Sequence, residues 1–491
     1  MRNIERREFL KTTGLLALGG LSIKAGAAAG AREESDSTRK ILQGHLATVE
    51  NHLNNGIIPF WFARALDTEY GGFVTNFDEQ GKALPCPEKY VNTQCRLIWW
   101  FSTLKRRFPE MPKTAEMASQ GVDFLIQHFW DEKYGGFAWK VKRDGSELDA
   151  AKIIYGESFC IYALSEYYLA TGDKRGLEYA GRTFDLLQKY AADTENGGYL
   201  ENVNRDWSPE AGGFAGGDRK GLDTHMHLME SFTTLYKASG DDLHRRKLLQ
   251  VTGLIKEKMI DKATGCGLNQ FDLAFNSLPA IPIKRTWNGE RLGEKPADPV
   301  DTTSYGHNVE LEYLMHLALK TANQEGDADR AIYRRLLDHA LKHGVDWEYG
   351  GIYRDGLRAT GEAIVKEKEF WQHSESLVAF LDGYEQFHEP RYLEAFGKIW
   401  QFVQDFMIIK GVGEWRTLVD RTGKPIDPNI GNPWKVCYHT GRSMVECRER
   451  LMRLLAAPPR SWKLTAGSSS DFRSLERQPA TATQQGETTG I

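Results

Sequence analysis

A short glycine-rich phrase recurs along the chain, and it decides the fold. It reads Tyr70-Gly71-Gly72-Phe73 at its first occurrence and Tyr134-Gly135-Gly136-Phe137 at its second. The later copies are Asn196-Gly197-Gly198-Tyr199, Gly265-Cys266-Gly267-Leu268, Tyr349-Gly350-Gly351-Ile352 and Gly411-Val412-Gly413-Glu414-Trp415. From first glycine to first glycine, the steps are 64, 62, 68, 85 and 61 residues. Six copies at a nearly constant step predict six structural repeats. Adjacent glycines between aromatic residues predict a tight turn with positive φ.

Two helices are expected in each repeat. In the fifth, apolar residues follow the 3.6-residue period of a helix: Leu393, Phe396, Ile399, Trp400, Val403, Phe406 and Met407. The pairs Gly172-Asp173 and Gly240-Asp241 mark helix ends. A last helix over about 437–455 needs a partner, and the helix expected over 39–54 supplies it. The sequence therefore predicts an all-α fold, an (α/α)6 barrel of six inner and six outer helices with short strands at the Gly-Gly turns. An open superhelix of helix pairs is the alternative.

The barrel is expected to span residues 31–457, between two segments of different character. Residues 1–30 contain Arg6-Arg7, a weakly apolar stretch over 12–23 and small residues over 25–30, which is the order of a secretory signal peptide. The arginine pair with Phe9-Leu10-Lys11 behind it resembles a twin-arginine (Tat) signal, which exports folded proteins. We therefore expect a periplasmic or extracellular location. Residues 458–491 are rich in Ser, Thr, Gln and Gly, which predicts a disordered C-terminal tail.

Composition narrows the classes of function. The chain has 491 residues and a formal net charge of −4, with no basic stripe for nucleic acid. No later stretch reaches the ~18 apolar residues of a membrane span. Six scattered cysteines without a Cys-x-x-Cys pair argue against a metal site. A P-loop and a dinucleotide fingerprint are both missing, so no cofactor is expected. We expect a monomer or weak dimer that binds a small, uncharged partner.

Polar residues gather where the first helix of each repeat is expected to begin. In order along the chain they are Asn92, Gln94 and Arg96; Tyr155, Glu157 and Ser158; Thr224, His225 and His227; Tyr305, His307 and Asn308; Trp371, His373 and Glu375; and Trp434, Tyr438, His439 and Arg442. The inner helices of such a barrel run in one direction, so these openings should converge on one mouth. Histidines gathered with arginine, and without a nucleophile motif, predict proton transfer, because imidazole titrates at about 6.5.

Each of these residues also has an ordinary structural interpretation. A single histidine near a helix start is commonly a cap or a satisfied buried group. His225 and His227 lie two apart, so on a helix they point away from each other and do not form a metal pair. Trp371 and Trp434, taken singly, are as compatible with a core position as with a sugar platform. It is their gathering at one mouth that favours a functional site.

At these residues the chain resembles the N-acylglucosamine 2-epimerase superfamily, and within it the cellobiose 2-epimerase branch. The resemblance covers roughly residues 39–455. It rests on five phrases in the right order: Asn92-Thr93-Gln94-Cys95-Arg96-Leu97-Ile98-Trp99, Tyr155-Gly156-Glu157-Ser158-Phe159, Asp223-Thr224-His225-Met226-His227-Leu228-Met229-Glu230, Ser304-Tyr305-Gly306-His307-Asn308-Val309-Glu310 and Trp434-Lys435-Val436-Cys437-Tyr438-His439-Thr440-Gly441-Arg442.

The resemblance implies an (α/α)6 barrel enzyme that opens a reducing-end sugar, removes the C2 proton and returns it to the other face of an enediolate. It implies no metal and no cofactor. By position, His307 and His439 correspond to the acid/base pair and His227 to a third essential histidine. The residues it implies for substrate binding are Arg96, Glu310, Trp371, Trp434, Tyr155, Glu157, Glu375 and His373.

The expected function is therefore C2 epimerisation of the reducing-end sugar of a β-1,4-linked disaccharide of the cellobiose or mannobiose type. Two departures leave the substrate open: Asp223 replaces the usual Asn, and His373-Ser374-Glu375 resembles the N-acylglucosamine branch. An aldose–ketose isomerase or an N-acylglucosamine 2-epimerase, acting on a monosaccharide, is the nearest alternative. An inverting glycoside hydrolase using Glu157, Glu310 and Glu375, or a non-catalytic sugar-binding protein, would belong to another class.

Overall fold

The computed structural model describes residues 36–293 and 299–456. The predicted signal peptide and C-terminal tail lie outside these residues. The chain divides into two parts, residues 44–454 and a smaller part made of 1–43 and 455–491. Within the smaller part, Arg39 Nη1 donates to the carbonyl of Leu455 at 3.0 Å. All that follows concerns residues 44–454, which carry the six repeats.

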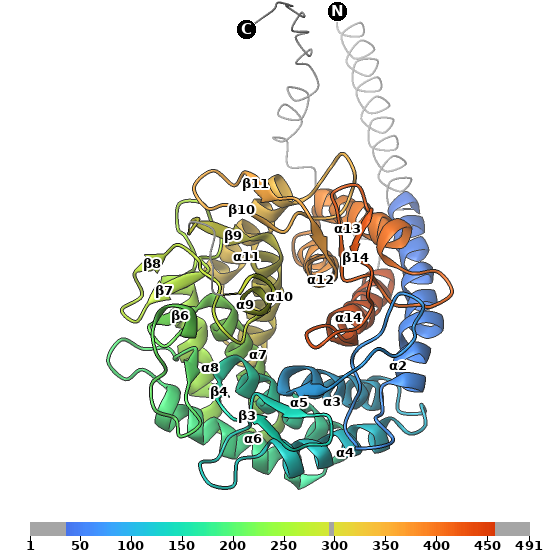
Figure 1. The fold of residues 1–491 in the computed structure, drawn as a ribbon. Helices are drawn as coiled ribbons and strands as arrows, with labels where there is room; N and C mark the ends of the chain where they lie inside the picture. The colour runs from blue at the N-terminus through green and yellow to red at the C-terminus, as the bar shows by residue number, and fades with distance from the viewer. Residues whose placement is uncertain (1–35, 294–298, 457–491) are drawn as a thin grey trace, which may run out of the picture. The chain divides into compact units, whose positions relative to one another are not determined.

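Six inner helices surround the centre of this part, and six outer helices lie around them (Figure 1). The inner helices are α3 (Val91–Arg107), α5 (Ile154–Thr171), α7 (Leu222–Ser239), α10 (Tyr305–Thr321), α12 (Phe370–Phe387) and α14 (Cys437–Ala456). The outer helices are 36–52, α4 (Thr114–Phe124), α6 (Lys174–Leu186), α8 (Asp242–Leu254), α11 (Asp327–His339) and α13 (Pro390–Phe402). The predicted (α/α)6 arrangement is confirmed.

Every outer helix ends in one wide π turn before the glycine phrase. These turns are η1 (Leu53–Ile57), η2 (Leu125–Phe129), η3 (Leu187–Ala191), η5 (Ile255–Met259), η6 (Ala340–Gly344) and η7 (Val403–Met407). In the first repeat a further short helix, α2 (Ile58–Arg64), follows. Antiparallel bridges then close each glycine turn, such as Trp130 with Phe137 and Ile260 with Gly267. The degraded copy at Gly265-Cys266-Gly267 is therefore a full repeat.

The glycine turns use two properties of glycine: the positive φ that the sequence predicted, and the absence of a side chain. Gly71 and Gly72 have φ values of 81° and 64°, in the left-handed region that glycine favours. A Cβ on Gly72 would also lie 2.8 Å from Oε1 of Gln94. That amide oxygen accepts the N–H of Phe73 at 2.9 Å, so the second glycine lets an inner helix bind the turn directly.

The same contact recurs around the ring. Counted from the start of each inner helix, the fourth residue accepts the backbone N–H that follows the glycine turn in five repeats. The donor and acceptor pairs are Phe73 and Gln94, Phe137 and Glu157, Tyr199 and His225, Gly267 and Asn308, and Ile352 and His373. In the sixth, Thr440 instead donates to Glu414, which accepts the N–H of Trp415. The fourth position therefore fixes each inner helix to its outer neighbour.

A buried lysine stands two residues before most inner helices and binds the acidic residue ahead of the glycine turn. Lys89 binds Asp67 at 3.0 Å, and both side chains are fully buried. The equivalent pairs are Lys152 with Asp131, Lys220 with Asp193 and Lys368 with Asp346. In the sixth repeat Lys435 instead binds Glu414, which follows the glycine turn. The lysine amines also donate to turn carbonyls, as Lys89 does to Gly71, so the buried charges are both paired and hydrogen-bonded.

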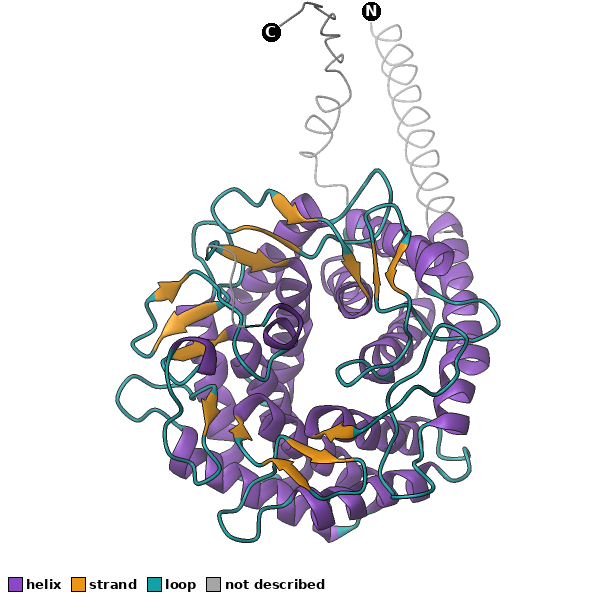
Figure 2. Cartoon of the chain, viewed as in Figure 1, coloured by secondary structure: helices purple, strands orange, loops and turns teal. Residues whose placement is uncertain are grey.

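Short antiparallel sheets join neighbouring repeats (Figure 2). The strand before an inner helix pairs with the hairpin that follows the next glycine turn; Tyr90, for example, faces Lys140. The sheets are β1 (Glu88–Tyr90), β2 (Lys140–Lys142) and β3 (Glu147–Asp149); β4 (Lys152–Ile153) and β5 (Asn202–Val203); β6 (Arg219–Gly221), β7 (Gln270–Asp272) and β8 (Ser277–Leu278); β9 (Thr302–Ser304), β10 (Asp355–Leu357) and β11 (Ala363–Val365); and β12 (Lys368–Glu369), β13 (Leu418–Val419) and β14 (Pro425–Asp427). The predicted short strands are confirmed.

The ring is closed between its first and last repeats. Thr48, on the first outer helix, accepts the indole N–H of Trp400 at 2.9 Å. Glu50 binds Arg448 of α14 at 2.8 Å, and His52 accepts the indole N–H of Trp415 at 2.7 Å. The open superhelix is therefore wrong. No helix among the described residues is both long and apolar enough to span a membrane.

Candidate active site

The first turns of the inner helices bring their side chains together by helical position. At about 100° per residue, positions two, three and six of a helix lie on one face, and position four lies about 150° from the middle of that face. Position four binds the outer turns, so positions two, three and six face the centre. Position six carries Arg96, His227, Glu310, Glu375 and Arg442 in five of the six repeats. All five side chains are buried.

His307, at position three of α10, is the most accessible of the three predicted histidines. Its side chain keeps 22% of its surface exposed, and its Nε2 lies 3.6 Å from Oδ1 of Asp223 on α7. Its ring lies 4.8 Å, centroid to centroid, from the ring of Trp371. His307 therefore faces open space with an aromatic ring on one side and a carboxylate on the other.

His439, at position three of α14, is held by a single carboxylate. Its Nδ1 lies 2.5 Å from Oε1 of Glu375. Burial lowers the pKa of His439 to about 3, although the hydrogen bond to Glu375 opposes the shift. A neutral imidazole whose Nδ1–H is donated to a carboxylate keeps the lone pair of Nε2, which is the form that a general base requires.

His227 differs from the other two because a carboxylate lies against each ring nitrogen. Nδ1 lies 2.9 Å from Oε2 of Glu230, and Nε2 lies 3.3 Å from Oδ1 of Asp223. Burial alone would lower the pKa of His227, but the bonds to Asp223 and Glu230 outweigh it and raise the pKa to about 10. His227 is therefore a fixed cation near neutral pH, suited to stabilising negative charge.

Arg442 lies at the centre of the cluster. Its guanidinium binds Glu230 at 2.5 Å, Glu310 at 2.7 Å and Glu375 at 2.8 Å. It also donates to the hydroxyl of Tyr438, which in turn bonds to Glu230. Three carboxylates from three helices therefore share one buried cation.

The carboxylates of this cluster do not ionise alike. Burial and the negative charge of Glu375 raise the pKa of Glu310. Burial also acts to raise the pKa of Glu375 and of Glu230, but Arg442 and the bonded histidines lower both. When neighbouring carboxyl groups have different pKa values, one can hold a proton while the others stay ionised.

Arg96 and Tyr155 lie together on the side of the site formed by α3 and α5. Arg96 donates to the hydroxyl of Tyr155 at 2.7 Å and to the carbonyl of Trp434 at 2.7 Å. Its guanidinium also lies over the ring of Phe159, 4.6 Å from the centroid. The ring of Tyr155 lies 5.2 Å from that of His227, so the predicted cation and histidine are neighbours.

The two predicted sugar platforms have different surroundings. Trp371 is partly exposed, and its ring lies between those of His307 and His439, at 4.8 and 6.1 Å. Trp434 keeps only 8% of its surface exposed and contacts other aromatic rings, including those of Tyr90 and Trp139. Trp371 therefore fits a platform beside the histidines more directly than Trp434 does.

Two predicted binding residues lie outside this cluster. Glu157 and His373 occupy position four of their helices, where they accept the backbone N–H groups of Phe137 and Ile352 at 2.8 and 3.2 Å. Both are buried. Their contacts assign them to the turns that fix the ring, and the interpretation of either as a substrate ligand has no geometric support.

Four residues of the cluster were given no catalytic or binding role from the sequence: Arg442, Glu230, Asp223 and Tyr438. Tyr438 and Arg442 were named only among the polar residues at the helix starts. Arg442 carried a sequence signal, because it shares position six with Arg96, His227, Glu310 and Glu375. Asp223 and Tyr438 occupy position two, like Tyr155 and Trp371. Aligning the six helix starts by position would have found these three residues.

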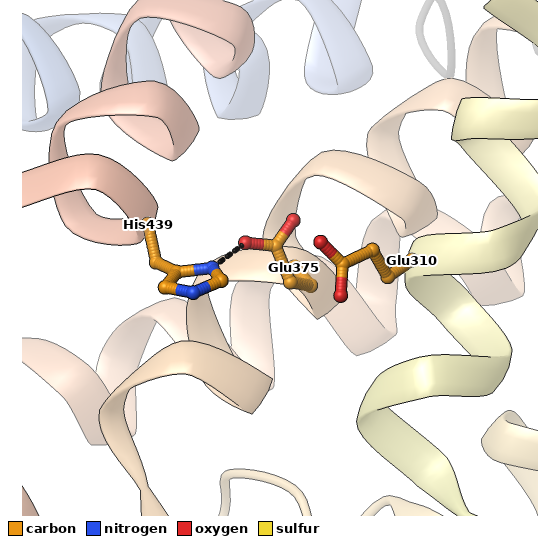
Figure 3. Close-up of side chains that lie close together, drawn as sticks. All are labelled: Glu310, Glu375 and His439. Carbon is orange, nitrogen blue, oxygen red and sulfur yellow. Dashed lines mark hydrogen bonds and ion pairs between the residues drawn. The ribbon is translucent and has the colours of Figure 1, made fainter. Parts of the chain in front are cut away.

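Within the described residues, one group has the geometry to hold a metal ion, namely Glu310, Glu375 and His439, whose donor atoms lie within 4.8 Å of one another (Figure 3). The figure shows His439 and Glu310 on opposite sides of Glu375, each from a different helix. Arg442 already binds one oxygen of each carboxylate. The positive charge of Arg442 would repel a metal ion placed between the two carboxylates, so the donor set does not fit a metal.

The arrangement can move a proton. It combines a neutral imidazole at His439, an accessible imidazole at His307 and fixed positive charge at His227, Arg96 and Arg442. A base removes a proton beside a carbonyl more readily when cations stabilise the oxyanion that forms. The site therefore has the groups needed for an enediolate intermediate.

Comparison with known proteins agrees with this chemistry. The family described as N-acylglucosamine 2-epimerase (GlcNAc 2-epimerase) matches residues 71–443. A cellobiose 2-epimerase from Bacteroides fragilis is 29% identical over 404 residues, which cover 81% of this chain and 97% of that protein. A D-mannose isomerase from Marinomonas mediterranea is 24% identical, over 83% of this chain and 97% of that protein.

Among solved structures, the cellobiose 2-epimerase of Bacillus thermoamylovorans B4167 superposes with a TM-score of 0.74. It is 25% identical in sequence, and the match covers 83% of this chain and all of that one. The match of the family extends from the first glycine turn to the last inner helix, so it includes every residue of the site described above. The chain belongs to the N-acylglucosamine 2-epimerase family of carbohydrate epimerases and isomerases.

Proposed function

We propose that this enzyme inverts C2 of the reducing-end sugar of a β-1,4-linked disaccharide of the cellobiose or mannobiose type, without a cofactor. The observation that carries the proposal is the position of Trp371, whose ring contacts both His307 and His439. A sugar stacked on that ring lies within reach of two imidazoles that come from different helices. Two such groups suit epimerisation, which needs proton transfer at both faces of a planar intermediate.

The proposed reaction begins with the open-chain aldehyde of the sugar. A histidine takes the C2 proton, the C2–H electron pair forms the C1–C2 double bond, and the carbonyl electrons move to O1 to give an enediolate. A histidine on the other face then donates a proton to C2, and the carbonyl re-forms. Neutral His439 is suited to the base role, and the cations His227 and Arg96 are suited to stabilising the oxyanion. Protons and electrons balance without a co-reactant.

An aldose–ketose isomerase is the second candidate, and a specific comparison favours it: the match with the D-mannose isomerase covers 97% of that protein and 83% of this chain. It would use the same enediolate and return the proton to C1 in place of C2. An N-acylglucosamine 2-epimerase would apply the C2 chemistry to a monosaccharide, and His373-Ser374-Glu375 was the sequence feature behind that alternative. Within that feature His373 binds a turn, while Glu375 binds His439 and Arg442 in the site.

The glycoside hydrolase alternative conflicts with the carboxylate geometry. An inverting hydrolase needs two carboxyl groups about 6.5–9.5 Å apart, with room for water between them. The nearest oxygens of Glu310 and Glu375 lie within 4.8 Å of each other, and both bind Nη2 of Arg442. Glu157, the third candidate, binds the backbone of Phe137. These residues do not form the required pair.

The function can be tested by incubating the protein with cellobiose, mannobiose, glucose, mannose and N-acetylglucosamine in heavy water. NMR would follow deuterium at C1 and C2 together with the configuration at C2. We expect deuterium at C2 and a change of configuration for the disaccharides. A ketose with deuterium at C1 would favour the isomerase, and inversion of the N-acetylated sugar alone would favour the third alternative.

His307→Asn and His439→Asn test the assigned roles. Loss of a positioned acid or base should lower the rate by about 10²–10⁴-fold. Asparagine at position 439 retains a donor for Glu375, so folding should be preserved. His244→Asn, on outer helix α8, is the matched control, because His244 bonds with Ser239 at 2.7 Å and packs against Phe184, outside the site. Near-normal turnover by both site variants would overturn the mechanism.

A further inference from the structure

The fourth step between glycine phrases is 85 residues long, while the others are 61–68 residues, and the proposed reaction does not explain the extra length. Within this stretch lies the short helix α9 (Trp287–Leu292). Figure 1 shows α9 on the viewer's side of the ring, in front of α10. The segment just before it is anchored to two other repeats, since Arg285 binds Asp149 at 2.8 Å and Glu210 at 3.3 Å.

Glu290 of α9 connects this helix to Trp434. Its Oε2 accepts the indole N–H of Trp434 at 3.0 Å and the hydroxyl of Tyr90 at 2.9 Å. Lys140 lies 3.8 Å from Oε1 of the same carboxylate. The only hydrogen-bonding atom on the indole of Trp434 is therefore committed to a residue of α9.

Arg291 connects α9 to Trp371 through one intermediate carboxylate. Glu369, just before α12, accepts the indole N–H of Trp371 at 2.6 Å. Arg291 forms an ion pair with the other oxygen of Glu369. Trp287 also donates to Glu369, at 3.4 Å, and its ring lies 6.2 Å from that of Trp434. The indole of each predicted platform is therefore oriented, directly or through one residue, by α9.

We propose that α9 is a specificity-determining element that holds the sugar unit beyond the reducing end, with Glu290 and Arg291 as positioning residues for Trp434 and Trp371. The proposal rests on the proposed function only for the identity of the ligand. Apolar C–H faces of a pyranose stack on flat aromatic rings, and the binding energy depends on ring orientation. Partly exposed Trp287 lies beside Trp434 and extends the aromatic surface outward from the histidines. A second sugar unit is the ligand that such a surface would hold.

The test compares Glu290→Ala and Arg291→Ala with the parent enzyme on cellobiose. It also measures binding of cellobiitol, the reduced disaccharide, which cannot turn over, by quenching of tryptophan fluorescence. Loss of a partly buried contact that orients a platform should raise KM and the Kd for cellobiitol by about tenfold. The value of kcat should change by less than about twofold, because the histidines are untouched.

Two further variants separate positioning from general damage. Glu290→Gln keeps an oxygen that accepts the indole N–H, so it should restore KM and Kd to within about threefold of the parent. Glu178→Ala, which removes an exposed partner of Arg182 on outer helix α6, is the matched surface control and should match the parent.

Three results would overturn the role of α9. One is an unchanged Kd in Glu290→Ala and Arg291→Ala. Another is a fall in kcat with no change in KM. The third is a Gln variant as impaired as the Ala variant. Because cellobiitol binding needs no turnover, the comparison of Kd values is independent of whether C2 inversion occurs. A parent protein that epimerises a monosaccharide yet does not bind cellobiitol would also contradict the proposal.

Discussion

Oδ1 of Asp223 lies 3.3 Å from Nε2 of His227, one helical turn further along α7. Glu230 binds the other nitrogen of the same ring. The side chain of Asp223 is 43% exposed, and the neighbouring imidazoles of His307 and His227 lower its pKa to about 2. The pair is therefore an ion pair over most of the pH range.

Asp223→Asn should reduce stability in a pH-dependent way. The raised pKa of His227 contributes stability that is complete below its ordinary pKa of 6.5 and is lost as the pH rises through about 10. The lowered pKa of Asp223 contributes stability that is present above its ordinary value of 3.8 and is lost as the pH falls towards about 2. The Tm difference between parent and variant should therefore be largest between about pH 4 and pH 6.5 and should shrink towards pH 10. The control is Asp242→Asn, at an exposed pair with Arg246. A difference that does not vary with pH would contradict the assignment.

Arg442→Met should destabilise the fold strongly. It would leave Glu230, Glu310 and Glu375 buried without their shared cation, and breaking a buried ion pair from one side costs about 3–5 kcal/mol. Arg442→Lys should cost less, because an ammonium keeps the charge but not the geometry that reaches three carboxylates. Urea unfolding at pH 7 measures the free energy of unfolding of both variants. Arg453→Met, which removes an exposed partner of Glu385 on the same helix, should cost less than about 1 kcal/mol. Equal losses at the two arginines would refute the central role of Arg442.

Trp371→Ala and Trp434→Ala should both weaken sugar binding, but only the second should lower the Tm appreciably. A stacked ring contributes about 1–3 kcal/mol through buried apolar area. Trp434 is 8% exposed and contacts several other aromatic rings, so its removal also leaves a cavity. Cellobiitol titration and thermal melts separate the two effects. Unchanged binding by Trp371→Ala would show that this ring is not a platform.

Turnover should not depend on added metal. Arg442 binds oxygens of both Glu310 and Glu375, and the Nδ1–H of His439 is donated to Glu375. A preparation treated with EDTA and desalted should keep its full rate on the accepted sugar. Mg²⁺, Mn²⁺ and Zn²⁺ would each be added back as controls. Loss of activity on chelation, with recovery by one of these ions, would show that the three side chains hold a metal.

Export should depend on Arg6-Arg7. Replacing both residues with lysine keeps the charge but removes the arginine pair that a twin-arginine signal requires. The variant should remain in the cytoplasmic fraction, while Arg2→Lys, outside the pair, should be exported like the parent. Fractionation with an antibody against the barrel measures the distribution. Unchanged export of the double variant would remove the basis for the twin-arginine proposal.

The sequence predicted the barrel because a backbone requirement recurs in it. A turn that needs positive φ and space for an incoming side chain leaves a visible glycine pattern, and even the copy at Gly265 and Gly267 retained it. Closure of the ring was also predictable, since the first and last helices lacked other partners. The Lys89–Asp67 type of pair went unnoticed, because a lysine two residues before a helix has no local signature; its partner lies in the preceding turn.

The site was predicted in part. One error concerns the direction in which neighbouring residues of a helix point, and another concerns contacts between helices. His373 and Glu375 lie two residues apart, which is about 200° on a helix, so one binds a turn and the other faces the centre. Polar residue type alone does not distinguish them. Arg442 was overlooked as the hub because its three partners come from three other helices, and only the tertiary arrangement brings them together. The longer fourth repeat was visible, but not that α9 within it contacts Trp434 directly and Trp371 through Glu369.

The attachment of each inner helix to its glycine turn depends on the fourth position, while the chemistry depends on the second, third and sixth. Attachment of the helices and chemistry therefore depend on different positions of the same repeated segment. Residues at the central positions other than Arg442 and its carboxylate partners can change, and with them the preferred sugar, while the contacts at the fourth position stay in place. Libraries for redesigning this enzyme should be built on the same division, varying the inward positions and leaving the fourth unchanged.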